Sequence, residues 1–457
     1  MCFWLGCHFT DSRVRVSGAS QTLTHPEESD PARKNKTRQD MSSSLCFPSP
    51  TREDLAHFVG LPLGALPTPC AIVQESTVRR NCRRLVEVAR DLGVGFRPHV
   101  KTHKTTEITR LQLEGLQSRN VIVSTVREAE ALEPLVREGV VAGILYGLPL
   151  PPSAVPALRA LRRRNPGVDV AVLLDHPAQI PAVEEGEAPW SVFVKVDNGY
   201  HRAGLPPDSS ELRNLLDVVA AKESEGALKL VGFYSHAGHS YGSTTQARSL
   251  QLLLEELHAV LVAARVLGDN ERELVLSVGA TPTALAAASS EWREHELLKH
   301  GKWSLELHAG VYTLLDLQQL ATRPAELGLA DVALTIMAEV VSVYPERDEV
   351  LVALGSTALG REPPPKDSIY PGWGTVTAWK EGQQWDGCAK SGWIVSRISQ
   401  EHAVLARHGE QQAVELKVGA KVRVWPQHAC IAGNGHGWYF VTDGEKVTDV
   451  WVRWRGW

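Results

Sequence analysis

The sequence lacks a cysteine framework and a long apolar run. Its 457 residues include seven cysteines, an odd number, scattered at positions 2, 7, 46, 70, 82, 388 and 430. This usage excludes the regular disulfide pattern of a small secreted domain and favours a reducing compartment. No apolar stretch approaches the roughly 20 residues that an α-helix needs to cross a bilayer. We therefore expect a soluble, cytoplasmic protein with no membrane partner.

Neither sign of charge is in large excess. The formal net charge at pH 7 is −5, and the pI is about 6.4. Nucleic-acid-binding domains usually carry a basic surface and a pI above about 9, so no nucleic-acid partner is expected. The chain is long enough to bury a large core, and its length predicts two domains.

The first 50 residues show neither a secretory leader nor the pattern of a folded domain. The apolar opening Met1–Cys7 lacks a basic leader and is followed at once by His8, unlike a signal peptide. Residues 11–50 are polar, rich in Ser, Thr and charge, and without apolar periodicity, which is typical of disorder. We expect residues 1–50 to form a disordered extension, with Met41 starting a more ordinary N-terminus.

Between about residues 65 and 325, short apolar runs alternate with amphipathic helical stretches. The strand candidates are Ala71–Gln74, Val94–Thr102, Val121–Val126, Val141–Tyr146, Val168–Leu174, Val192–Val196, Leu230–Ser235, Leu274–Val278 and Leu305–His308. Strands that alternate with helices predict parallel βαβ units. Eight or nine such units over about 260 residues fit a (β/α)8 barrel better than an open sheet. We assign this barrel to residues 51–328.

After about Leu329 the pattern changes to strand-like runs separated by turns. These runs are Val332–Val343, Val350–Leu354, Gly374–Trp379, Trp393–Ile398, Ala403–Ala406, Lys421–Val424 and Trp438–Val441. We expect residues 329–457 to form a β-rich C-terminal domain. The predicted fold class is therefore α/β, a TIM-type barrel followed by a β-rich domain.

Polar residues gather where the predicted barrel strands end. Lys101 follows one strand, at the face where α/β proteins place their sites. Apolar surroundings would lower the pKa of this lysine and allow its amine to form a Schiff base. The alternative is a solvated basic loop, because Lys104 and two histidines lie beside it. A shared site at the barrel mouth is favoured by four further polar strand ends, Lys195–Arg202, Tyr234–Tyr241, Ser277–Thr283 and Glu306–Tyr312.

Two short segments have the composition of ligand sites. In Gly279–Thr283, glycine lets backbone N–H groups approach an anion, hydroxyls can donate, and proline can open the next helix. A helix cap by Thr281 explains the same segment. His428 and Cys430, two apart on an extended chain, place an imidazole and a thiolate on one face, and both groups bind zinc. A buried structural cysteine beside a histidine explains that pair equally well.

Together these motifs, in this order, resemble the fold-type III pyridoxal-phosphate enzymes of the alanine racemase-like superfamily. The similarity covers roughly residues 60–445 and is to the branch of the eukaryotic D-serine dehydratases and the D-threonine aldolases. It implies that Lys101, within Pro98–Thr102, carries pyridoxal 5′-phosphate. It also implies further cofactor-binding residues, namely Arg202, His236, Tyr241, Gly279, Thr281, Gly310 and Tyr312.

The resemblance gives several of these residues a role. Arg202 would approach the phenolic oxygen of the cofactor, and His236 would pack against its pyridine ring. The segments Ser277–Thr283 and Gly310–Tyr312 would bind its phosphate. Ala280 stands where a hydroxyl residue is common in the family, so Thr281, within the first segment, would carry more of that contact.

The C-terminal motif of Pro426, His428 and Cys430 resembles the zinc ligands of the dehydratases, which makes His428 and Cys430 the expected metal ligands. The aldolases typically carry an aspartate in place of Cys430 and use a harder ion such as manganese, whereas a thiolate selects zinc. The resemblance therefore implies a dehydratase that converts D-serine to pyruvate and ammonia. Lys101 would take the α-proton, and Zn2+ would act on the substrate hydroxyl as a Lewis acid. It also implies a homodimer.

Three other activities remain open from the sequence. A D-threonine aldolase would cleave a β-hydroxy D-amino acid to glycine and an aldehyde. An amino-acid racemase would need a second base on the opposite face of the cofactor and no metal. A non-enzymatic pyridoxal-phosphate-binding protein is usually a lone barrel, so the expected β domain argues against it.

Overall fold

The structure, a computed structural model, describes residues 48–184, 188–268, 272–295, 303–366, 368–379, 391–409 and 412–457. All of them lie within one compact unit that runs from Ser44 to Trp457. The predicted extension, residues 1–50, falls almost entirely outside this part of the chain. Among the described residues, no helix combines the length and the apolar character that crossing a membrane requires.

Three of the seven cysteines lie in the described part of the chain. Cys70 and Cys82 are buried, Cys430 is partly buried, and all three are free thiols. The expectation that the chain has no disulfide framework also concerned four cysteines outside the described residues, namely Cys2, Cys7, Cys46 and Cys388.

A chain that begins at Met41 should keep the melting temperature and the activity of the full-length chain. The segment that it lacks has no apolar periodicity, so it should add little to a hydrophobic core. Thermal unfolding and turnover of the two chains, measured side by side, test this expectation. A clearly lower melting temperature for the shorter chain would show that residues 1–40 pack on the fold.

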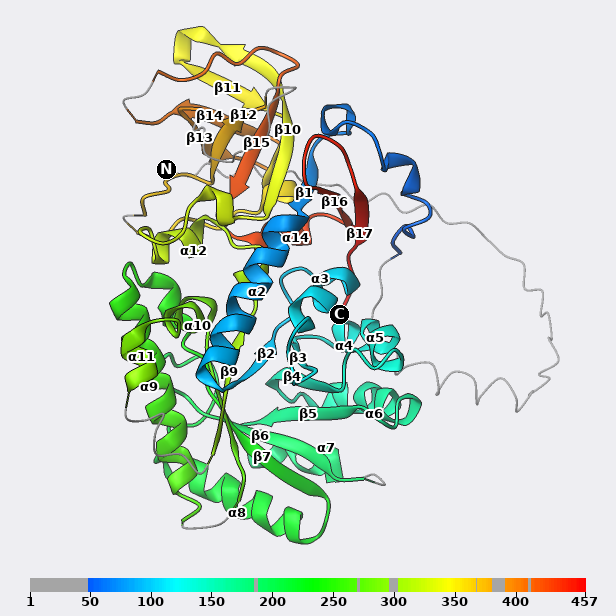
Figure 1. Cartoon of the computed structure of the whole chain (residues 1–457), viewed down its shortest axis with the longest axis vertical. Helices are drawn as coiled ribbons and strands as arrows, with labels where there is room; N and C mark the ends of the chain where they lie inside the picture. Colours follow the sequence, from blue (N-terminus) through cyan, green and yellow to red (C-terminus); the bar gives the residue numbers. More distant parts are fainter. Residues whose placement is uncertain are drawn as a thin grey trace, which may run out of the picture. The chain divides into compact units, whose positions relative to one another are not determined.

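Eight parallel strands form the barrel that the sequence predicted (Figure 1). They are β2 (Gly95–Pro98), β3 (Asn120–Val123), β4 (Gly143–Pro149), β5 (Asp169–Leu174), β6 (Trp190–Lys195), β7 (Leu228–Tyr234), β8 (Val275–Val278) and β9 (Ser304–Ala309). Their order in the sheet is β2-β9-β8-β7-β6-β5-β4-β3. A bridge between His99 and Ile122 joins the two end strands, so the barrel is nearly closed and the predicted fold class is confirmed.

Helices connect the strands and cover the outside of this barrel (Figure 1). They are α2 (Glu75–Leu92), α3 (Thr106–Leu113), α4 (Val126–Ala131), α5 (Glu133–Arg137), α6 (Val155–Arg164), α7 (Pro181–Glu184), α8 (Ser210–Ser224), α9 (Gln246–Arg265), α10 (Thr281–Ala286) and α11 (Ser290–Glu294). A further helix, α12 (Leu317–Thr322), follows the last barrel strand and leads to β10. Helix α9 begins at an N-cap, where the Thr245 hydroxyl accepts from the backbone N–H of Arg248. Its buried leucines, Leu250, Leu252, Leu253 and Leu257, belong to the face that packs toward β7, β8 and α10.

The other sheet has nine strands. They are β1 (Cys70–Gln74), β10 (Leu334–Tyr344), β11 (Glu349–Val352), β12 (Gly374–Ala378), β13 (Trp393–Ile398), β14 (Ala403–Arg407), β15 (Lys421–Pro426), β16 (Trp438–Thr442) and β17 (Asp449–Val452). Strand β11 pairs with both β14 and β10, which closes β10–β15 into a small antiparallel barrel. Two short helices, α13 (Ser356–Leu359) and α14 (Ala429–Asn434), lie in the connections.

The prediction that Ala71–Gln74 is a barrel strand is wrong. This segment is part of β1, which pairs antiparallel with β10 and parallel with β16. A short apolar run predicts a buried strand but does not identify the sheet that the strand joins. Because α2 follows β1 directly and leads to β2, the chain contributes to the second sheet before it enters the barrel.

Candidate active site

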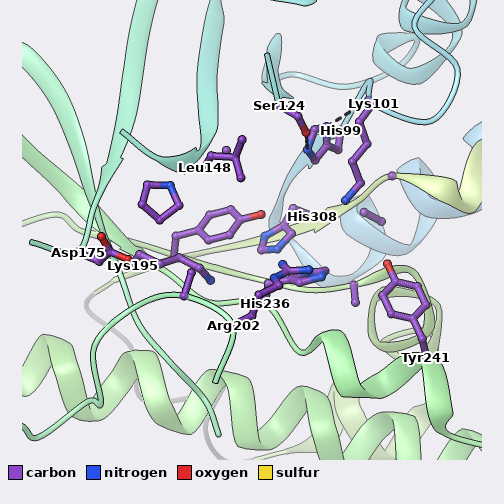
Figure 2. A pocket seen from close by; sticks show the side chains of 17 residues that line it. His99, Lys101, Ser124, Leu148, Asp175, Lys195, Arg202, His236, Tyr241 and His308 are labelled. Atoms are coloured by element: carbon purple, nitrogen blue, oxygen red, sulfur yellow. Dashed lines mark hydrogen bonds between the residues drawn. The ribbon is translucent and has the colours of Figure 1, made fainter. Parts of the chain in front are cut away.

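A cavity of about 530 Å3 lies at the carboxyl ends of the barrel strands (Figure 2). Every barrel strand, or the loop that follows it, contributes to the lining. The lining residues are His99, Lys101, Ser124, Gly147, Leu148, Pro149, Asp175, Lys195, Arg202, Ala203, Tyr234, His236, Tyr241, Ala280, His308, Ala309 and Gly310. This is the face at which (β/α)8 enzymes place their catalytic residues.

The structure brings five of the predicted cofactor residues to this cavity, namely Lys101, Arg202, His236, Tyr241 and Gly310. The other three, Gly279, Thr281 and Tyr312, are not part of the lining. The Tyr312 ring is buried and packs edge-on against the ring of Phe96, with 5.5 Å between the centroids.

Lys101 lies in the segment that closes the barrel. The backbone N–H of His99 donates to the Ala309 carbonyl (2.8 Å) and that of Val100 to the Ile122 carbonyl (3.1 Å). The chain is thereby fixed between β9 and β3 immediately before the lysine. These backbone bonds place Lys101 at the inner wall of the barrel mouth.

The Lys101 side chain extends into the cavity toward His308 and His236 (Figure 2). Burial lowers the pKa of its amine from the usual value, as the sequence analysis expected for a reactive lysine. Lys104, three residues on, instead forms an ion pair of 3.1 Å with the buried Glu128. The alternative of a solvated basic loop around Lys101 is therefore wrong.

Aromatic rings form one wall of the cavity. The Tyr234 and His308 rings are stacked, with 4.2 Å between their centroids and 11° between their planes. The His236 ring lies 6.0 Å from that of His308, and its Nδ1 donates to the Gly279 carbonyl (2.7 Å). Burial holds the pKa of both histidines well below the usual value. Both rings are therefore neutral at physiological pH.

Lys195 is a second amine in the cavity, and the sequence analysis gave it no role. Its Nζ lies 4.8 Å from the centroid of the Tyr234 ring, and burial lowers its pKa to about 7. Arg202 lines the same cavity from the loop after β6. The cavity thus holds two lysines and one arginine, and burial lowers the pKa of both lysines.

The segment after β8 departs from the predicted anion site. Gly279 has a φ of +143°, and a Cβ at this position would lie 2.3 Å from the His308 carbonyl oxygen, so glycine is required. The Gly279 N–H donates to Glu256 Oε1 (3.2 Å). This N–H group is therefore already bonded and is not available to an anion.

The cap at the start of α10 is also not the predicted one. The Thr283 hydroxyl accepts from the Ala280 N–H (2.8 Å), whereas the buried hydroxyl of Thr281 makes no hydrogen bond within the described part of the chain. A cap by Thr281 is thus wrong. An unpaired buried hydroxyl is costly unless a ligand completes it.

The predicted metal ligands, His428 and Cys430, lie where α14 begins. The Cys430 Sγ is 3.2 Å from the hydroxyl of Thr102, the residue after Lys101. The described residues contain no group of three or more His, Cys, Asp or Glu side chains that could hold a metal ion. Any metal here would therefore keep positions that these two side chains do not fill.

His428 and Cys430 also influence each other. Burial disfavours the Cys430 thiolate, but the hydrogen bond and charge of His428 outweigh it and lower the pKa of the thiol. Burial likewise disfavours the His428 imidazolium, but Cys430 raises the pKa of His428 to about 9. Asp316 fixes the residue between them, because its Oδ2 accepts from the Ala429 N–H (2.8 Å).

Arg453 connects the lysine segment with α14. Its buried guanidinium donates to the carbonyl oxygens of His103 (3.1 Å) and Thr102 (3.4 Å) and to that of Gly433 in α14. One side chain from the C-terminal segment therefore holds together the segments that carry Lys101 and Cys430.

Sequence reasoning missed several residues of this site. His99, Lys195, Tyr234 and His308 were noted as polar strand ends but received no role, although their positions were the available signal. For Glu256 the sequence signal was weaker: it is an acidic residue on the otherwise apolar face of α9.

Two family models match the chain. Residues 73–301 match the alanine racemase N-terminal domain, and residues 333–442 match a serine dehydratase domain. The first model covers the barrel strands from β2 to β8, and the second covers most of the strands that follow β9. Their order along the chain agrees with the order of the motifs.

Curated relatives extend this match over nearly the whole chain. A D-serine dehydratase of Schizosaccharomyces pombe is 36% identical over 92% of this chain and 99% of its own length. A D-serine dehydratase of Saccharomyces cerevisiae is 35% identical over 88% of this chain and 99% of its own length. The solved D-threo-3-hydroxyaspartate dehydratase of Delftia sp. HT23 is 29% identical, covers 87% of this chain and 100% of that chain, and has a TM-score of 0.73. The predicted resemblance is confirmed, and the chain belongs to the D-serine dehydratase family of pyridoxal-phosphate-dependent lyases.

Proposed function

We propose that this chain is a pyridoxal-phosphate- and zinc-dependent D-serine dehydratase, which converts D-serine to pyruvate and ammonia. The observation that carries the proposal is the thiol of Cys430 beside Thr102, directly after the lysine of the cavity. A soft ligand at that place favours zinc over the harder ions. The D-serine dehydratases among the relatives support the same substrate.

The cavity fits pyridoxal phosphate by its size and by its unsatisfied groups. It has about 530 Å3, within the usual range for a small-molecule site. The Nε2 of His308, a residue of the lining, is buried and makes no hydrogen bond within the described residues, so it is open to a polar ligand. The buried hydroxyl of Thr281, the residue after Ala280 of the lining, is also unpaired among them. When bound, the cofactor supplies an aldehyde for a lysine amine and an electron sink for the α-carbon of the substrate.

The proposed roles come from the resemblance, and the positions of the side chains in the cavity support them. Lys101 holds the cofactor, and its amine, with a pKa lowered by burial, takes the α-proton of the substrate. Arg202 would face the phenolic oxygen of the cofactor, as the resemblance implies. The ring of His236 would pack on the pyridine ring, and Tyr241 lies across the cavity from His99 and Ser124 (Figure 2).

The phosphate would be bound by groups of the loops after β8 and β9. Thr281 offers the free hydroxyl, and Gly310 lines the cavity. Gly279 contributes through its backbone shape, because its N–H is engaged by Glu256. Tyr312, two residues after Gly310, packs against Phe96.

His428 and Cys430 would hold the zinc ion. An imidazole and a thiolate are both common zinc ligands, and a site with open positions is typical of a catalytic zinc. When bound, zinc supplies a Lewis acid that stabilises the departing hydroxyl group. A cysteine-to-alanine variant of the related D-threo-3-hydroxyaspartate dehydratase has been solved in a metal-free form, which supports a link between cysteine and metal in this family.

Incubation of the purified protein with D-serine should produce pyruvate and ammonia in equal amounts. Loss of the α-proton and the β-hydroxyl leaves an enamine, and water converts it to these two products. Coupled assays for pyruvate and ammonia measure both. If D-serine gave no pyruvate and D-threonine gave glycine and an aldehyde, the protein would be an aldolase and the proposal would be contradicted. If D-serine gave only L-serine, the protein would be a racemase.

Further properties are proposed from the resemblance and the composition. We propose that the protein is a homodimer, is cytoplasmic, and acts only on small D-amino acids. The three free thiols of the described part agree with a reducing compartment. We also propose the division between barrel and C-terminal domain at residues 328 and 329, which lie between α12 and β10.

A further inference from the structure

Glu256 is a carboxylic acid in the middle of an apolar helix face. It lies in α9, on the same face as Leu253, Leu257 and Val260, and it is 0% exposed. Acidic side chains are almost never fully buried unless they are paired or hydrogen-bonded, because desolvation of the charge is costly. Burial raises the pKa of Glu256 to about 7. Such a residue in a core requires a specific reason.

The carboxyl group of Glu256 makes three hydrogen bonds, and all of them go to segments behind the cavity wall. Oε1 accepts from the backbone N–H groups of Ala237 (2.6 Å) and Gly279 (3.2 Å). Oε2 accepts from the hydroxyl of Thr283 (3.2 Å). One side chain thus joins the loop after β7 to the loop after β8 and to the first turn of α10.

These two loops carry residues of the proposed cofactor site. Ala237 follows His236, whose ring lines the cavity. Gly279 precedes Ala280, which lines the cavity, and Thr281, whose hydroxyl is unpaired. His236 and Gly279 also bond to each other directly (2.7 Å). Glu256 therefore bonds both to the residue after His236 and to Gly279, the residue that accepts the hydrogen bond of the His236 ring.

We propose that Glu256 is a positioning residue, which fixes the ring-stacking and phosphate-binding segments in the geometry that pyridoxal phosphate requires. This inference rests on the proposed function of the cavity. Glu256 does not line the cavity and acts through Ala237, Gly279 and Thr283. Residues behind a site that orient its ligands typically change affinity tenfold to a hundredfold when they are lost.

The test compares Glu256→Ala and Glu256→Gln with the matched control Glu255→Ala. Glu255 is the neighbouring carboxylate on the same helix, but its side chain is 43% exposed and pairs with Arg248. The measurement is the equilibrium dissociation constant of pyridoxal phosphate from the apoprotein, together with the visible circular dichroism of the bound cofactor. The second signal reports the orientation of the cofactor rather than turnover.

Glu256→Ala should raise the dissociation constant by about tenfold to a hundredfold and reduce the dichroism. Glu256→Gln should remain within about threefold of the unaltered protein, because its Oε1 still accepts from both backbone N–H groups. Glu255→Ala should change neither signal. An unchanged dissociation constant in Glu256→Ala would overturn the inference.

If Glu256→Ala does not fold, Thr283→Val tests the inference in its place. It removes the hydroxyl that bonds to Oε2 and to Ala280, and it conserves the shape of the side chain. A raised dissociation constant supports the inference, and an unchanged one overturns it. If the unaltered protein bound no pyridoxal phosphate, the proposed function itself would fail. If it bound the cofactor and Glu256→Ala matched Glu255→Ala, only the positioning role would fail.

Discussion

Lys101→Ala should remove the visible absorption of the bound cofactor and slow pyruvate formation from D-serine by about a thousandfold or more. The variant loses both the covalent attachment point and the base that takes the α-proton, and positioned acid–base groups alone contribute roughly 100-fold to 10,000-fold. Among the residues that the structure describes, Lys101 is the lysine that extends from the closing segment toward His236 and His308 (Figure 2). Absorption spectra and initial rates measure the two effects.

Two controls separate Lys101 from the lysines near it. Lys104→Arg should keep the absorption and the rate, because it preserves the charge that pairs with the buried Glu128. Lys195 is the other lysine of the cavity, so borohydride reduction of the unaltered protein followed by peptide mapping should find the cofactor on Lys101. Cofactor on Lys195 or Lys104 would contradict the assignment.

The barrel and the residues at its mouth could be predicted from the sequence because both depend on local patterns. Apolar runs that alternate with helical stretches predict parallel strands, and the carboxyl ends of such strands meet at one face. Lys101, Arg202, His236, Tyr241 and Gly310 belong to these strand ends, the resemblance selected them among the residues there, and all five reach one cavity.

The features that the sequence could not predict depend on contacts between distant segments. Strand β1 joins the second sheet through partners more than 200 residues further along the chain, in β10 and β16. The segment Gly279–Thr283 was predicted to let backbone N–H groups approach an anion, but α9 brings Glu256 to the N–H group of Gly279. Arg453 contacts the segment after β2 from the far end of the chain. Neither spacing nor composition reveals such pairs.

Chelation of zinc should abolish pyruvate formation from D-serine while the cofactor absorption and the melting temperature change little. The two predicted ligands lie beside the lysine segment, and no third His, Cys, Asp or Glu completes the group among the described residues. The metal would therefore be open to substrate rather than structural. Loss of a Lewis acid costs several kcal/mol at the transition state, which corresponds to about a hundredfold or more in rate.

Cys430→Ala should have the same effect as chelation, with loss of zinc measured by elemental analysis. Cys70→Ala is the matched control, because Cys70 is a buried free thiol in β1, and this variant should keep its zinc and its rate. Cys430→Asp should shift the metal preference toward manganese, since a carboxylate is a harder ligand than a thiolate, and should raise the cleavage of D-threonine to glycine. If the chelated protein dehydrated D-serine at an undiminished rate, His428 and Cys430 would be structural residues, and the departure of the hydroxyl group would depend on the side chains of the cavity alone.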